Sequence, residues 1–350
     1  MKTIKLIFSI LLVGMVGLFF TQCSEDNVQP TVLYSISGTV TYPDFSGTAT
    51  SAAGATVFLQ VDGDGTSTIY DMSAVADASG NYTFANLLPG SYFVWATYNT
   101  NNTNASGRYD DIIFTGAGVV VEVVATDVTQ AFALASAAET GTVSFDTNLY
   151  DGTTNPNETR FDGAHSSVVF GFPYKAGTDE FIGQFTGFDI GVKFDQANLS
   201  ASAITATIDL TTVDTGQSGR DSKGKCIGST FGIEYDPADT LADGSFDPAA
   251  IPLDGTDLAT FTSRSIEKYG NGYLAKGDMV FNGNTATVNL FFTYEPGFSS
   301  TNSSNVTTEY SSFKGTMEFA ALSAFGIDSS NIGDSAVTVY VSVQLRKTLP

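Results

Sequence analysis

The sequence predicts an all-β chain made of two successive β-rich parts. Short runs in which apolar and polar residues alternate recur along it, as in residues 34–42 and 286–294. Gly, Pro, Asn and Asp, the residues that tight turns require, separate these runs. Glycine is frequent, at 35 of 350 residues, and Ser and Thr occur throughout, which favours strands and turns over helices.

Charge and composition exclude several functional classes. The chain has 15 Lys and Arg against 37 Asp and Glu, a formal net charge of −22, whereas a nucleic-acid-binding protein needs clustered cations. One His and two Cys, Cys23 and Cys226, are too few for a zinc finger or a three-His catalytic zinc. No nucleophile motif or acid–base pair stands out. We therefore expect no enzymatic activity, no catalytic residues, no metal and no cofactor, and we expect His165 to be a packed, hydrogen-bonded residue that opens a strand.

Residues 1–22 have the features of an export signal. Lys2 and Lys5 accompany an apolar stretch over residues 4–20, which is short for a membrane-spanning helix. A permanent transmembrane helix is the alternative interpretation. The stretch ends in Phe-Thr-Gln-Cys, which resembles the lipobox of bacterial lipoproteins, and the resemblance implies that Cys23 is acylated and anchors the chain in a membrane.

The residues after Cys23 begin a linker over residues 23–33. Ser24, Glu25 and Asp26 resemble the surface-export signal of Bacteroidota lipoproteins. An ordinary acidic linker is the alternative. The resemblance implies an exported bacterial protein, attached to the outer membrane and displayed at the cell surface.

Residues 34–137 predict a seven-stranded β-sandwich. Alternation or apolar runs mark its strands, and Gly, Pro or Asp turns lie between them. Six of the expected strands fall at residues 34–42, 55–61, 81–84, 91–98, 119–124 and 130–134. The run from Asp77 to Tyr92, with Ser37–Val40 and Gly54–Val57 before it, resembles the carboxypeptidase-regulatory-like (prealbumin-like) modules. That resemblance implies a structural spacer, with a ligand site as the alternative.

Residues 142–350 form the second predicted β part, after a short join of small and polar residues. An Asn-Gly turn at residues 282–283 predicts a hairpin, and residues 337–346 place one apolar and one mostly polar face on a strand. Several blocks in order resemble the YceI-like family: His165–Phe170, Gly183–Phe188, Val192–Asp195, Lys276–Gly283 and Phe313–Gly315. The resemblance implies a lipocalin-like antiparallel β-barrel that encloses a polyisoprenoid chain.

Alternating apolar faces in this second part supply the candidate ligand wall. The wall residues are Val168, Phe170, Phe172, Tyr174, Phe188, Phe292 and Val341. Their alternative role is to fill a closed core. Arg220, Lys223 and Lys225 form the densest basic cluster of the chain, and we interpret it as a head-group site at the barrel mouth or as a solvated loop.

These features predict a membrane-anchored lipoprotein whose barrel binds a long apolar ligand, such as a polyisoprenoid or an isoprenoid quinone. The sandwich would then act as a spacer between the membrane and the barrel. The alternative function is cell-surface adhesion or glycan binding by a lipoprotein with a filled barrel core. Exposed aromatic residues near Asn99–Asn104 or Phe298–Asn305 would favour that alternative.

Overall fold

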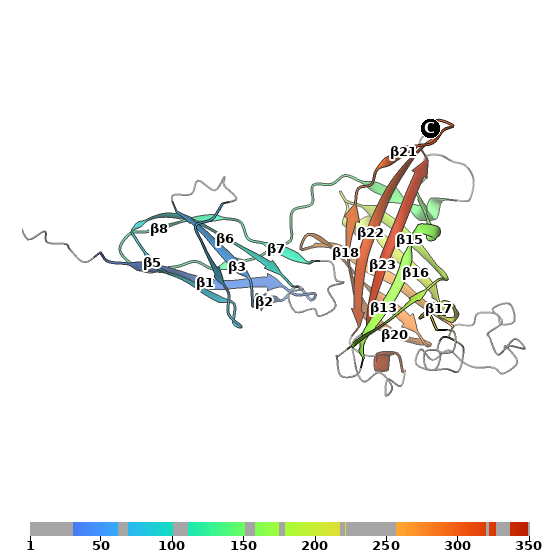
Figure 1. Cartoon of the computed structure of the whole chain (residues 1–350), viewed down its shortest axis with the longest axis horizontal. Helices are drawn as coiled ribbons and strands as arrows, with labels where there is room; N and C mark the ends of the chain where they lie inside the picture. The colour runs from blue at the N-terminus through green and yellow to red at the C-terminus, as the bar shows by residue number, and fades with distance from the viewer. Residues whose placement is uncertain are drawn as a thin grey trace, which may run out of the picture.

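The computed structural model confirms that the chain is all-β. The helical elements named in the described part are short 3-10 turns, and no described helix has the length or apolar character to cross a membrane. Figure 1 shows two β parts joined by one segment. The structure describes residues 31–61, 69–100, 111–150, 158–174, 179–217, 221, 257–319, 322–326 and 337–348.

The first part, called here the N-terminal sandwich, consists of two five-stranded sheets that pack on a common core. In one sheet β10, β5, β9 and β2 all pair with β1, and in the other the order is β4-β3-β6-β7 with β8 also paired to β6. Ten strand segments replace the seven expected, because several have only two or three residues. The strands are β1 (Tyr34–Pro43), β2 (Ala49–Ser51), β3 (Thr56–Val61), β4 (Met72–Val75), β5 (Asn81–Leu87), β6 (Gly90–Asn99), β7 (Ile113–Thr115), β8 (Val119–Val123), β9 (Val128–Thr129) and β10 (Phe132–Ala133).

The second part is one antiparallel sheet of 13 strands that curls around a single apolar core, called here the curled sheet. Its main path is β11-β15-β16-β18-β19-β20-β22-β23-β13-β14-β17. Its strands are β11 (Ser144–Asp146), β12 (Arg160–Phe161), β13 (Ser167–Tyr174), β14 (Asp179–Phe185), β15 (Phe188–Asp195), β16 (Ala203–Asp209), β17 (Val213–Asp214), β18 (Leu258–Tyr269), β19 (Gly272–Phe281), β20 (Asn284–Glu295), β21 (Ser299–Thr301), β22 (Thr307–Phe319) and β23 (Val337–Thr348). The 3-10 turns are η1 (Thr147–Leu149), η2 (Gly163–His165), η3 (Leu199–Ala201), η4 (Leu210–Thr212) and η6 (Leu322–Phe325).

The predicted closed barrel is wrong in one respect. Hydrogen-bonded pairing runs from β11 to β17 and, among the described strands, no ladder joins these two ends. Both end strands have only two or three residues, so neither presents a long edge for pairing. The rings of Phe161 on β12 and Phe188 on β15 lie 6.0 Å apart.

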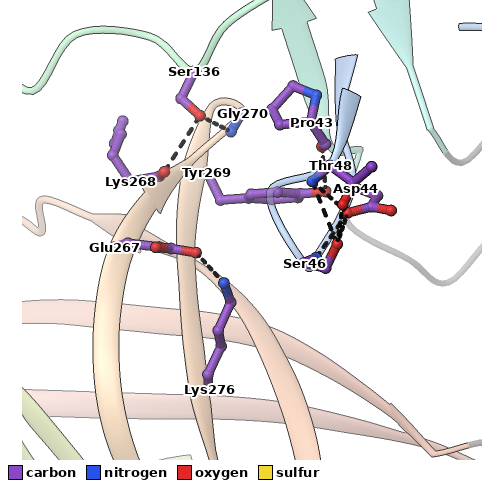
Figure 2. Close-up of polar contacts among 10 residues, drawn as sticks. All are labelled: Pro43, Asp44, Ser46, Thr48, Ser136, Glu267, Lys268, Tyr269, Gly270 and Lys276. Atoms are coloured by element: carbon purple, nitrogen blue, oxygen red, sulfur yellow. Dashed lines mark hydrogen bonds and ion pairs between the residues drawn. The ribbon is translucent and has the colours of Figure 1, made fainter. Parts of the chain in front are cut away.

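The tip of the β18–β19 hairpin inserts into the N-terminal sandwich (Figure 2). The Tyr269 hydroxyl donates a hydrogen bond to the Pro43 carbonyl at 3.0 Å, and its ring meets Phe114 edge-on at 5.0 Å. The Gly270 N–H donates to Ser136 Oγ at 2.9 Å. Tyr269, with Leu274 and Phe291, belongs to the core cluster of the sandwich. The two parts therefore share buried apolar surface beyond the covalent join.

Candidate functional site

An apolar cavity of about 60 Å³ lies within the curled sheet. Side chains from eight strands line it, and Thr260 is the one polar residue among them. Inward positions alternate along each strand, so every strand contributes one to three apolar side chains to the lining. Representative lining residues are Val168, Ile190, Phe261, Met279, Phe292 and Val341.

The predicted wall residues divide into two groups. Val168, Phe292 and Val341 line the cavity. Phe170 and Phe172 are buried but do not line it. They pack instead on β14, where the rings of Phe172 and Phe181 stack 4.9 Å apart.

The Phe170 ring also lies over Gly183, the residue directly opposite it in the β13–β14 ladder. A Cβ at that glycine would lie 2.4 Å from the Phe170 ring, so only glycine leaves room for the ring there. Phe188 is partly buried at the edge of the same core. Tyr174 ends β13, and its side chain lies outside the described residues. Phe170, Phe172 and Phe188 therefore complete the core around the cavity and do not form its lining.

The cavity volume limits what can enter without rearrangement. For comparison, an apolar cavity of about 150 Å³ admits benzene. A long hydrocarbon chain therefore needs the core to open. Met279 on β19 and Met317 on β22 both line the cavity. Unbranched methionine side chains adapt to irregular space more readily than branched ones. Sequence reasoning missed both residues, although each lies at an inward position of an alternating strand.

A polar cluster holds the join between the two parts against the curled sheet. The Tyr273 hydroxyl donates to Glu139 and accepts from Gln196 Nε2 at 2.9 Å. Lys268 Nζ lies 3.8 Å from Glu139 Oε2 and 4.4 Å from the centre of the Tyr273 ring. Tyr273 also stacks on Phe292, with ring centres 5.3 Å apart. The join is thereby in contact with the wall of the cavity through one aromatic pair.

Two groups of this cluster have shifted pKa values. Burial, followed by the hydrogen bond to Glu139, raises the pKa of the Tyr273 hydroxyl. Burial alone would raise the pKa of the Glu139 carboxyl. The hydrogen bonds from Tyr273 and from the Gly141 N–H, together with the charge of Lys268, lower it overall. Glu139 is therefore held as a carboxylate at neutral pH.

His165 differs from the expectation. It lies in η2 just before β13, its side chain is 66% exposed, and its Nδ1 lies 3.2 Å from Asp162 Oδ2. It is hydrogen-bonded but not packed, because the 3-10 turn that follows Asp162 directs it outwards. Within the described ranges, no group of three His, Cys, Asp or Glu side chains is placed to hold a metal ion.

Several predicted functional residues lie outside the described residues. At the N-terminus these are the lipidation and export candidates Cys23, Ser24, Glu25 and Asp26. Later in the chain they are the head-group candidates Arg220, Lys223 and Lys225, and the neighbouring Cys226. Their roles stay predictions.

Comparison with known proteins identifies a family whose domain matches the second part of the chain. The YceI-like domain matches residues 160–348. BcnA of Burkholderia cenocepacia is similar over 53% of this chain and 98% of its own, at 23% identity and a TM-score of 0.36. A YCEI protein of Campylobacter jejuni is similar over 48% of this chain and 84% of its own, at 16% identity and a TM-score of 0.31. No curated protein matches the chain.

Proposed function

Because the chain belongs to the YceI-like family, we propose that its curled sheet binds a long apolar ligand, such as a polyisoprenoid or an isoprenoid quinone. The observation that carries this proposal is the cavity, which is lined almost entirely by aliphatic and aromatic side chains from eight strands. Such a lining offers apolar contacts all round a guest and only one hydroxyl to orient it, which suits a hydrocarbon chain. The protein then acts as a carrier and not as an enzyme.

Burial of hydrocarbon supplies the driving force. Removing a few hundred Å² of an isoprenoid from water contributes roughly 25 cal/mol per Å², or several kcal/mol before ordering costs. Because the cavity measures about 60 Å³, part of this free energy is used to move core side chains. We propose that Met279 and Met317 move, since they can change rotamer without a polar group being buried.

A variant that fills the cavity tests this proposal. Ala259 is 1% exposed and lines the cavity, so Ala259→Leu adds apolar volume where the guest would lie. We expect farnesol to raise the melting temperature of the wild type, because a ligand that binds only the folded state stabilises it. The increase should be lost in Ala259→Leu. If the leucine side chain lowers the stability of the folded protein, the smaller substitution Ala259→Val replaces it in the test. Farnesol that stabilises neither protein, or both equally, contradicts binding at the cavity.

We also propose that Cys23 anchors the protein in the outer membrane, that Ser24, Glu25 and Asp26 direct it to the cell surface, and that the sandwich is a spacer. The sequence of the first 26 residues supports this proposal. Cys23→Ala should move the protein from the membrane fraction to the soluble fraction. Replacement of the three export residues by Ala should reduce cleavage by protease on intact cells while the protein stays in the membrane fraction. A Cys23→Ala variant that stays in the membrane fraction would contradict the anchor.

A further inference from the structure

The outer face of one sandwich sheet carries a row of four aromatic rings. Tyr70 lies 4.7 Å from Phe58, and Phe58 stacks on Trp95 with ring centres 5.3 Å apart and an interplanar angle of 21°. Phe93 continues the row at 5.5 Å from Trp95. The rings come from β3, β6 and the segment before β4, and β3 and β6 lie side by side (Figure 1).

Strand alternation turns these rings away from the core. On β3 and β6 the fully buried positions include Leu59 and Val94. Phe58 and Trp95 occupy the opposite face, where they are only partly buried. The sandwich core therefore does not use them. Tyr70 is 48% exposed.

The row is also held in place. The Phe93 ring lies directly over Gly118, where a Cβ would lie 2.0 Å from the ring. The site is therefore preformed, which lowers the ordering cost of binding. Two exposed apolar side chains lie on neighbouring strands: Val120 opposite Phe93, and Val75 opposite Thr56, two residues before Phe58. Exposed apolar surface of this kind marks interaction sites.

The charge of this face restricts the chemical class of partner that it can bind. The sequences of β3, β4, β6 and β8 contain no Lys or Arg, and Glu122 is their one carboxylate. Nucleic acids and anionic lipid surfaces need cations that these four strands lack. Uncharged hydrogen-bonding side chains surround the rings instead: Thr56, Gln60, Ser73, Ser91 and Thr97.

Partly exposed stacked rings with uncharged polar neighbours match the chemistry of a sugar, because a pyranose has an apolar C–H face and a rim of hydroxyl groups. We propose that this face, within a chain of net charge −22, binds a neutral polysaccharide across Phe58 and Trp95. The site is separate from the apolar cavity and does not depend on it.

The single tryptophan of the chain allows a direct test, because Trp95 is the only source of its indole fluorescence. The purified full-length protein is titrated with laminarin, yeast mannan and soluble starch, and with polygalacturonate as an anionic comparison. Retardation in native gels that contain each polysaccharide supplies a second readout. We expect at least one neutral polysaccharide to shift Trp95 emission to shorter wavelength and to retard the protein, and polygalacturonate to do neither.

Variants then test whether the polysaccharide binds at this row of rings. Phe58→Ala should weaken binding about tenfold, the upper range for one aromatic pair, and Trp95→Ala should abolish retardation. Phe298→Ala tests the competing location, since it removes the exposed ring of the Phe298–Asn305 segment, which stacks on Tyr310 in the curled sheet, and it should bind as the wild type does. Circular dichroism checks that each variant folds. The proposal is overturned if no neutral polysaccharide binds, if Phe58→Ala binds normally while folded, or if the face instead forms a dimer that Trp95→Ala separates.

Discussion

Glu139 is a single side chain that fixes the join between the two parts. It accepts hydrogen bonds from the Tyr273 hydroxyl and the Gly141 N–H, and it lies near the Lys268 ammonium. The join was expected to be small and polar, and nothing in its own sequence distinguishes Glu139 from a solvated acid. Two of these partners, Lys268 and Tyr273, come from β18 and β19, more than 120 residues away, so only the folded chain reveals this role.

A pH series tests the role of Glu139. Because the folded-state pKa of its carboxyl lies below the ordinary value of about 4.3, its contribution to stability is present above that pH. The contribution is lost as the pH falls through the lowered value. Glu139→Gln should therefore lower the melting temperature at pH 7 and have less effect at pH 3. Glu309→Gln, an exposed position on β22, is the control. An effect of Glu139→Gln that is the same at both pH values would be inconsistent with a carboxylate at this contact.

Substitutions at Phe170 and Val341 test whether the predicted wall residues divide into packed core residues and cavity-lining residues. Phe170 is fully packed against Phe185 and Gly183, so Phe170→Ala should reduce the free energy of unfolding by about 3–5 kcal/mol. Val341 lines the existing cavity and is only partly buried, so Val341→Ala should cost about 1–2 kcal/mol. Urea denaturation measures both. Equal losses for the two variants would show that Phe170 and Val341 are packed alike.

At the scale of elements, strands with clear alternation could be predicted and short strands could not. Residues 34–42 and 337–346 correspond closely to β1 and β23. By contrast, β2 and β7 have three residues each and owe their conformation to pairing with β1 and β6. A pattern of three residues carries too little periodicity to identify a strand. The same limit applies to the sheet order, because no local pattern shows that β11 and β17 leave the curled sheet open.

The β18–β19 hairpin is the element that joins the two cores, and Tyr269 at its end offers a graded test. Tyr269→Phe keeps the ring and loses only the hydrogen bond to the Pro43 carbonyl, so it should cost about 1 kcal/mol. Tyr269→Ala also empties buried space beside Phe114 and should cost about 3–5 kcal/mol. Thermal and urea unfolding of the full chain measure these losses. A Tyr269→Ala variant as stable as Tyr269→Phe would mean that the ring contributes nothing to the junction.

At the scale of the molecule, residue patterns along the chain predicted the two β parts, the YceI-like character of the second part and the apolar face of its strands. Two properties could not follow from them. The shared junction depends on three residues of the curled sheet, Tyr269, Leu274 and Phe291. In the sequence, nothing distinguishes these three from other strand residues. The cavity volume is a small difference between the space that the strands enclose and the volume of the side chains that fill it, and alternation does not determine it.

The boundary predicted between the parts gives a test at this scale. Residues 142–350 should unfold cooperatively on their own, because the curled sheet has its own core. Its melting temperature should be lower than in the full chain, since removal of the sandwich exposes Tyr269, Leu274 and Phe291. Differential scanning calorimetry of the two proteins makes the comparison. Loss of cooperative unfolding in the shorter protein would reject the boundary, and an unchanged melting temperature would argue against a stabilising junction.

The central claim is that the curled sheet holds a long apolar ligand. Its most direct test is organic extraction of the folded protein purified from bacterial cells, followed by mass spectrometry of the extract, with Ala259→Leu prepared in parallel. The account predicts an isoprenoid or quinone in near-stoichiometric amount from the wild type, and a strongly reduced amount from the variant that fills the cavity. An extract of the wild type that contains no apolar lipid above the level of the Ala259→Leu extract would contradict it.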